Sequence, residues 1–171
     1  MKKWALVGKS LVVVFVAAVL VLSVAGQQRM AGLAGAWRVT EVTTTGPNGS
    51  TNSNLQPRLV LFTGTHYARV GVTAPNPRPL PQPGTFVDDS LVLQQWGPFV
   101  ADAGTYQVNG TEVTLRAIVA KNPAIMSSDG RFFVTYTFRI EGNSLTLTQK
   151  NNANGPLAPV VTKLIRAEPT S

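Results

Sequence analysis

The stretch GAWRVTEVTTT, residues 35–45, decides the fold, because a glycine and a tryptophan lead into alternating β-forming residues. Side chains of a strand alternate between its two faces, so Trp37, Val39 and Glu41 share one face. The Gly, Pro, Asn and Ser residues of the following GPNGSTNSN (46–54) are typical of a turn or loop. We therefore expect the first strand at 37–45.

An apolar leader precedes this strand. Three lysines stand before or at the edge of an unbroken apolar run at 11–22, and small residues follow at 23–25. This pattern is typical of a secretory signal peptide, whereas an uncleaved membrane anchor would need a run of roughly 20 residues. The chain is accordingly expected to be secreted or periplasmic and to comprise a signal peptide (1–26), a linker (27–34) and one domain (35–171).

Composition narrows the class of protein. Beyond the leader, twelve basic and eight acidic residues leave a formal charge of +4, and the basic residues are scattered singly. A nucleic-acid-binding protein would normally show a basic cluster or stripe, so nucleic acid is not expected as a partner. The chain has no cysteine, so burial of apolar side chains must hold the domain without disulfides or thiolate metal sites.

Turn signals divide the remaining chain into further strands. Gly64-Thr65, Asn109-Gly110 and Gly142-Asn143 are typical of tight hairpin connections. Five prolines make 74–84 an extended loop, and the Asp and Ser residues that follow it predict a short helix at 88–96. The predicted strands are 37–45, 57–63, 66–73, 103–108, 112–120, 131–141, 144–150 and 160–168. Eight antiparallel strands predict a closed all-β barrel whose interior holds side chains or one small ligand.

Alternation also predicts which side chains face inwards. Within RFFVTYTFRIE (131–141), the apolar residues occupy the even positions, whereas arginines, threonines and a glutamate occupy most odd ones. The even positions should therefore point into the barrel. Applied to the strands in turn, this reasoning places the following residues inside: Trp37, Val39, Glu41, His66, Tyr106, Val108, Val113, Leu115, Ala117, Phe132, Val134, Tyr136, Phe138, Ile140, Leu145 and Leu147.

With these elements in place, the chain resembles the lipocalin-like branch of the calycin barrels. The Gly35-Ala36-Trp37 triplet is similar to the family's Gly-x-Trp at the start of the first strand. The segment GTYQVNGTEVTL (104–115) resembles the middle hairpin of bacterial lipocalin-like domains, and TKLIRAE (162–168) resembles their last strand. The family's second and third signature regions are not recognisable, and the 74–84 loop is an elaboration, so the resemblance does not extend to the ligand.

The resemblance implies an up-and-down barrel with one closed end. In that family an arginine near the chain's end lies over the tryptophan, and Arg166 would take this role above Trp37. A guanidinium over an indole face contributes roughly 0.5 to 2 kcal/mol. Trp37 and Arg166 are therefore expected to close the barrel rather than to contact a ligand.

Few residues have the pattern of a reactive site. His66 is the only histidine and is either a haem ligand or a hydrogen-bonded rim residue. Glu41 either meets a polar group in the lumen, or it lies at the mouth or is turned outwards by a bulge, and we favour the second interpretation. Asp88 and Asp89 fit a helix cap better than an acid–base pair, and Tyr106 and Tyr136 fit core aromatics better than ligand donors.

No catalytic triad, metal-ligand spacing or phosphate loop is recognisable, so no catalytic residue, metal or cofactor is expected.

These observations favour a monomeric, non-catalytic binding protein for a small apolar or amphipathic ligand in the lumen, with the helix and the proline-rich loop as a lid. Contact with a membrane is expected only through an uncleaved leader. The candidate ligand contacts are Glu41, His66, Tyr106, Leu115, Tyr136 and Phe138. One alternative is a filled barrel that binds a protein or glycan through its Pro-rich and Asn-rich loops. Another is an enzyme or haem carrier that uses His66 and tyrosine residues. A lumen below roughly 150 Å³ would favour the filled barrel, because ligand pockets typically start near 300 Å³.

Overall fold

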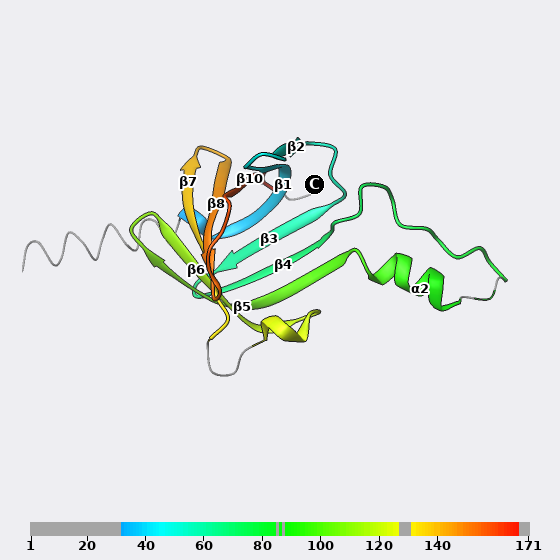
Figure 1. Cartoon of the computed structure of the whole chain (residues 1–171). Helices are drawn as coiled ribbons and strands as arrows, with labels where there is room; N and C mark the ends of the chain where they lie inside the picture. Colours follow the sequence, from blue (N-terminus) through cyan, green and yellow to red (C-terminus); the bar gives the residue numbers. More distant parts are fainter. Residues whose placement is uncertain (1–31, 85, 87, 127–130, 168–171) are drawn as a thin grey trace, which may run out of the picture.

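The computed structural model describes residues 32–84, 86, 88–126 and 131–167, so the expected signal peptide lies outside the described residues. The described chain is built almost entirely from strands (Figure 1). The eight longer strands are β1 (Gly35–Thr44), β3 (Arg58–Thr63), β4 (His66–Val72), β5 (Phe99–Asn109), β6 (Glu112–Ala120), β7 (Val134–Glu141), β8 (Ser144–Asn152) and β10 (Val160–Arg166).

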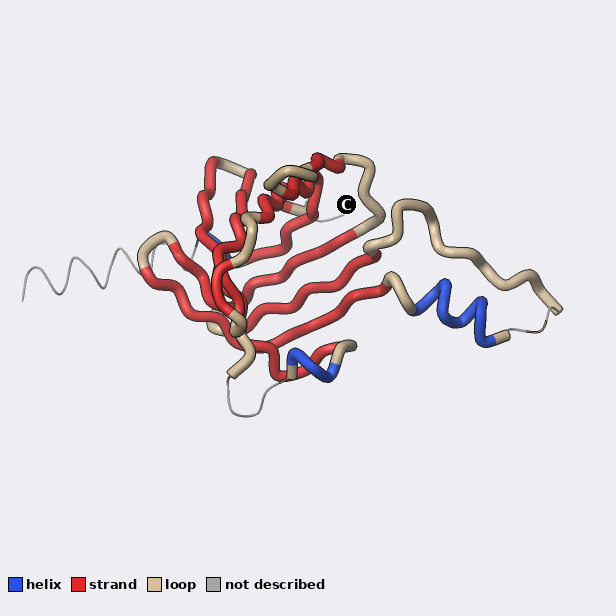
Figure 2. Tube along the Cα trace, in the orientation of Figure 1, coloured by secondary structure: helices blue, strands red, loops and turns tan. Residues whose placement is uncertain are grey.

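These eight strands close into an antiparallel barrel. Consecutive hairpins pair β3 through β8 in chain order, and β10 then pairs with both β8 and β1. Figure 2 shows that strands make up most of the described chain. The first and last long strands are directly in register, with Trp37 opposite Arg166. Closure satisfies the backbone groups that an open sheet would leave at its edges. The predicted eight-stranded barrel is confirmed.

Three short elements were not predicted. The strand β2 (Ser50–Asn52) pairs with β1 inside the segment expected to be only a loop, and β9 (Gly155–Pro156) pairs with β8. A 3₁₀ turn, η1 (Pro123–Ile125), follows β6 and is capped by the Asn122 side chain. In addition, β5 begins four residues before its predicted start, because 99–102 pairs with the end of β4.

The predicted helix is present as α2 (Asp89–Trp96). The Asp88 carboxylate accepts a hydrogen bond of 2.8 Å from the Leu91 backbone N–H, which satisfies one of the donors left free at a helix start. Together with the proline-rich loop, α2 projects beyond the ends of β4 and β5 (Figure 1). The two segments therefore form an arm beside the barrel and do not cover it as a lid.

No residue of α2 is buried, and Leu93 and Trp96 are more than half exposed. Among the described residues, no helix is long and apolar enough to cross a membrane.

Most of the predicted inner face is confirmed. A single core fills the closed half of the barrel, and its side chains come from every long strand. Its buried members include Trp37, Phe62, Tyr106, Val113, Leu115, Tyr136, Phe138, Leu145, Leu147 and Leu164. Leu33, which falls within the expected linker, is also fully buried in this core.

The inner-face assignment of β4 is wrong. Tyr67 and Arg69 point inwards because they pair with the inward-facing Phe62 and Val60 of β3. His66 is therefore exposed beside the hairpin turn, where its Nδ1 lies 3.1 Å from the Thr65 hydroxyl oxygen. Apolar side chains at the even positions of β4 made the outer face look like the inner one.

Glu41 is also not inside the barrel. The register of β1 against β10 shifts between Val39 and Glu41, and this irregularity brings Glu41 opposite Lys163. The Lys163 Nζ lies 2.8 Å from the Glu41 carboxylate, and Lys163 is exposed. A bulge, which is one of the two arrangements that we favoured from the sequence, therefore removes Glu41 from the lumen.

Candidate ligand-binding cavity

Trp37 and Arg166 lie together at one end of the barrel. The Arg166 guanidinium carbon is 4.4 Å from the centroid of the Trp37 ring, and the indole Nε1 donates to the Leu33 carbonyl at 2.8 Å. Arg166 also donates to the carbonyls of Ala34 and Gly32, each at 3.0 Å. The contact implied by the resemblance is present, and it ties residues 32–34 across this end of the barrel.

Gly35 is required by the same contact. Its φ of +128° is rarely adopted by residues with a side chain, and a Cβ there would lie 2.6 Å from Arg166 Nη1. The glycine of the Gly35-Ala36-Trp37 triplet therefore leaves room for the guanidinium that covers the indole.

A cavity of about 530 Å³ occupies the other part of the barrel. It extends from core residues towards the ends of β3, β4 and β5, where Val100 and Lys121 are exposed to solvent. Most of its wall is apolar, and the apolar side chains include Val39, Val60, Phe62, Leu115, Leu147 and Leu164. The lumen is therefore well above the size expected of a filled barrel.

One polar cluster stands on the cavity wall. Arg69 donates from Nε and Nη2 to the Asp102 carboxylate at 3.0 and 2.9 Å, and the Tyr67 hydroxyl donates to the same carboxylate at 2.7 Å. The remaining Nη1 of Arg69 donates to the Tyr136 hydroxyl at 2.8 Å. Burial, together with the hydrogen bond to Asp102, raises the pKa of Tyr67, so this phenol stays protonated. The cluster is electrically neutral, because one guanidinium balances one carboxylate.

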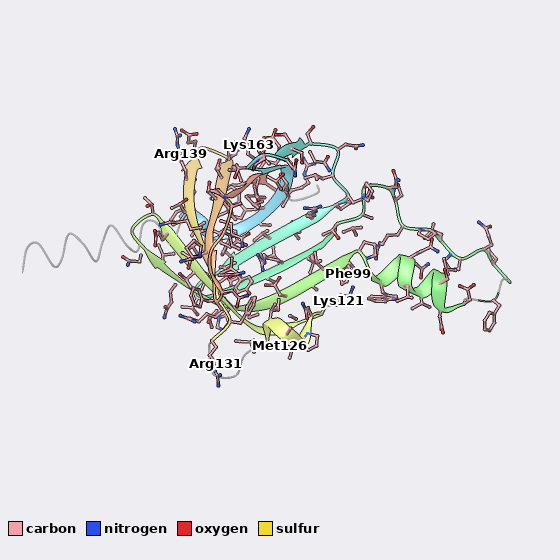
Figure 3. The ribbon with its side chains drawn as sticks, viewed as in Figure 1. Phe99, Lys121, Met126, Arg131, Arg139 and Lys163 are labelled. Carbon is pink, nitrogen blue, oxygen red and sulfur yellow. The ribbon has the colours of Figure 1, made fainter. Side chains whose placement is uncertain are left out.

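Two further cations stand at the mouth. Arg58 begins β3, and its Nε donates to the Val72 carbonyl on β4 at 3.1 Å. Lys121 follows β6, and its Nζ donates to the carbonyls of Trp96, Gly97 and Phe99. Figure 3 shows Phe99 and Lys121 where β5 meets α2. The Lys121 ammonium thereby also compensates the carbonyl groups left free at the C-terminus of α2.

The sequence-predicted contacts divide into three groups. Leu115 and Tyr136 line the cavity, Tyr106 and Phe138 are buried in the core but are not among its lining residues, and Glu41 and His66 lie outside.

Tyr106 packs edge-to-face against Phe62, with ring centroids 5.2 Å apart. Its buried hydroxyl finds no hydrogen-bond partner within the described part of the chain, and burial raises its pKa.

Sequence reasoning missed Arg58, Arg69 and Asp102. The last two are the only formally charged side chains of β4 and β5, and opposite lone charges on neighbouring strands are a signal for a buried pair. No such signal exists for Arg58, because both faces of β3 carry apolar residues and alternation alone does not tell its inner face from its outer one. The described residues contain no group of three His, Cys, Asp or Glu side chains that could hold a metal ion.

The closed eight-stranded barrel, its Trp37–Arg166 contact and its apolar cavity define a lipocalin-like barrel. No family model matches the sequence, and no curated protein matches it. Among solved structures, a lipocalin-like protein from Bacteroides uniformis is 13% identical with a TM-score of 0.45, covering 80% of this chain and 99% of that one. A variant of the fluorescent protein UnaG is 14% identical with a TM-score of 0.36, covering 81% of this chain and 99% of that one.

Proposed function

We propose that this protein is an extracytoplasmic, non-catalytic binding protein that carries a small apolar or amphipathic molecule in its barrel. The observation that carries the proposal is the cavity of about 530 Å³ with a mainly apolar wall. Transfer of apolar surface from water into such a wall contributes about 25 cal/mol per Å². A ligand that buries roughly 200 Å² would gain about 5 kcal/mol from this term, before the cost of losing its free motion.

The chemistry of the wall supports binding rather than catalysis. Its carboxylate, Asp102, already accepts from Arg69 and Tyr67, and Tyr136 accepts from Arg69. These side chains are hydrogen-bonded to one another, so none of them is a free general base next to a nucleophile. His66, on which an enzyme or haem carrier would depend, lies exposed at the hairpin. The size of the cavity likewise speaks against the filled-barrel alternative.

The extracytoplasmic part of the proposal rests on the leader. Its lysines, apolar run and small residues have the order of a signal peptide, and they precede a barrel that is complete without them. Fractionation of the native host tests this part: the mature chain should start near residue 27 and appear outside the cytoplasm. A full-length chain in the cytoplasm would contradict it.

Filling the cavity tests the binding function. Leu115 lies on the cavity wall, so Leu115→Trp should lower the affinity for the neutral apolar probe N-phenyl-1-naphthylamine by about tenfold or more, since the indole occupies ligand space. The matched control is Ile118→Trp on the same strand, whose side chain is 62% exposed and which should bind as the parent does. Probe fluorescence gives the affinity, and circular dichroism checks that each variant is folded. Equal binding by both folded variants would show that the cavity is not the site.

A further inference from the structure

We propose that the cargo is an amphipath with a carboxylate head and that the Arg58 guanidinium holds this head at the cavity mouth. This inference rests on the proposed function and specifies its ligand class. It starts from the charges on the cavity wall, where Arg58, Arg69 and Lys121 face a single carboxylate, Asp102. The described wall therefore carries an excess of positive charge.

The excess charge belongs to the mouth and not to the interior. The charge of Arg69 is neutralised by Asp102, and Arg69 Nη1 donates to the Tyr136 hydroxyl. An anion next to this pair would meet the Asp102 carboxylate as well as the Arg69 guanidinium. The interior cluster consequently suits the uncharged part of a ligand.

Lys121 contributes charge but few donors. An ammonium has three N–H groups, and Lys121 directs its Nζ at three carbonyl oxygens around the start of β5. It is paired with no carboxylate among the described residues. Lys121 therefore raises the positive potential of the mouth without offering a free binding group.

Arg58 supplies the free donors. Of its five N–H groups only the Nε group has an acceptor in the described chain, the Val72 carbonyl, so the Nη1 and Nη2 groups are available. The described residues offer Arg58 no carboxylate partner. A planar guanidinium matches the two oxygens of a carboxylate, and this match favours a carboxylate head.

Gly71 positions Arg58. The two residues are paired across β3 and β4, and a Cβ at Gly71 would lie 2.6 Å from Arg58 Cγ. The arginine side chain thus crosses β4 through the space that the glycine leaves, and it reaches the Val72 carbonyl. Val72 is paired with Phe99, whose carbonyl accepts from Lys121, so the two cations are anchored on neighbouring residues of the rim.

The test compares two ligands that share one tail, dodecanoate and 1-dodecanol, by displacement of N-phenyl-1-naphthylamine at pH 7.5. The parent protein should bind dodecanoate about tenfold or more tightly than the alcohol, since a charge-assisted hydrogen bond contributes a factor of this order. Arg58→Gln should remove this preference, because it lowers the affinity for dodecanoate much more than the affinity for the alcohol. Circular dichroism checks that the variant is folded.

Two further variants sharpen the test. Arg38→Gln removes the same charge from the exposed face of β1, opposite Leu59, and should keep the preference for dodecanoate. Gly71→Ala keeps Arg58 but takes the space its side chain occupies, so it should weaken dodecanoate binding alone. Equal affinities in the parent, or a preference that survives Arg58→Gln, would overturn the assignment of Arg58 while leaving the carrier function intact. Failure of the parent to bind the probe and both ligands would contradict the carrier function itself.

Discussion

At the scale of single residues, the closed end depends on Trp37 and Arg166, which lie 129 positions apart in the chain and face one another across paired strands. The pairing is recognisable from the sequence only because the Gly-x-Trp triplet and the arginine of the last strand resemble a known pattern. The hydrogen-bond acceptors of the two side chains are not recognisable from the sequence. They are the carbonyls of Gly32, Leu33 and Ala34, which belong to the segment expected to be a linker. Nothing in that short segment marks its backbone as a set of acceptors.

Replacement of Arg166 should destabilise the barrel strongly. Arg166→Met removes the cation–π contact and leaves two carbonyls without their donors, so the free energy of unfolding should fall by about 2–4 kcal/mol. Arg139→Met is the control, because Arg139 is exposed and its ion pair is with the exposed Glu141, and such pairs contribute about 0–1 kcal/mol. Urea unfolding of the parent and of the two variants measures the loss of unfolding free energy in each. A loss at Arg166 no larger than at Arg139 would refute the role of the closed end.

At the scale of elements, period two and turn chemistry predict most of the fold. Strands β6 and β8 and the helix α2 start at or within one residue of their predicted positions, because each follows a clear turn or cap signal. The errors arise where a strand carries apolar residues outside and a charge inside, as β4 does, or where a bulge shifts the register, as β1 does at Glu41. Which face of a strand points inwards and where its register shifts depend on the neighbouring strand, so neither can be read from the segment's own sequence.

The arm containing α2 should unfold independently of the barrel. Asp88→Ala removes the N-terminal cap of α2, a helix that buries no residue. Loss of the cap should lower the stability of the helix by about 0.5–2 kcal/mol, so backbone hydrogen exchange in 89–96 should become faster. The urea midpoint of the barrel should stay the same, because no core residue lies in α2. Asp89→Ala keeps the cap and is the control. A lower barrel midpoint in Asp88→Ala would mean that the arm is part of the cooperative core.

At the scale of the whole molecule, one half of the barrel serves mainly stability and the other half serves ligand binding. Its closed half is packed by large apolar side chains around Trp37, whereas its other half leaves a cavity that opens among charged residues at the mouth. The number of strands is predictable from the sequence, but the size of the cavity is not, because it depends on how inward side chains pack across the lumen. The charge of the mouth is likewise a property of neighbouring strands, since Arg58, Gly71 and Lys121 come from separate segments.

The central claim is that the cavity holds a small molecule, and native mass spectrometry of the protein purified from its own host's envelope fraction tests it most directly. The intact mass should exceed that of the mature chain by one small molecule, which mild collisional activation releases and whose mass identifies the cargo. Leu115→Trp, prepared in the same way, should carry little or none of it. Bare parent protein, together with no binding of neutral or carboxylate-headed probes, would contradict the claim.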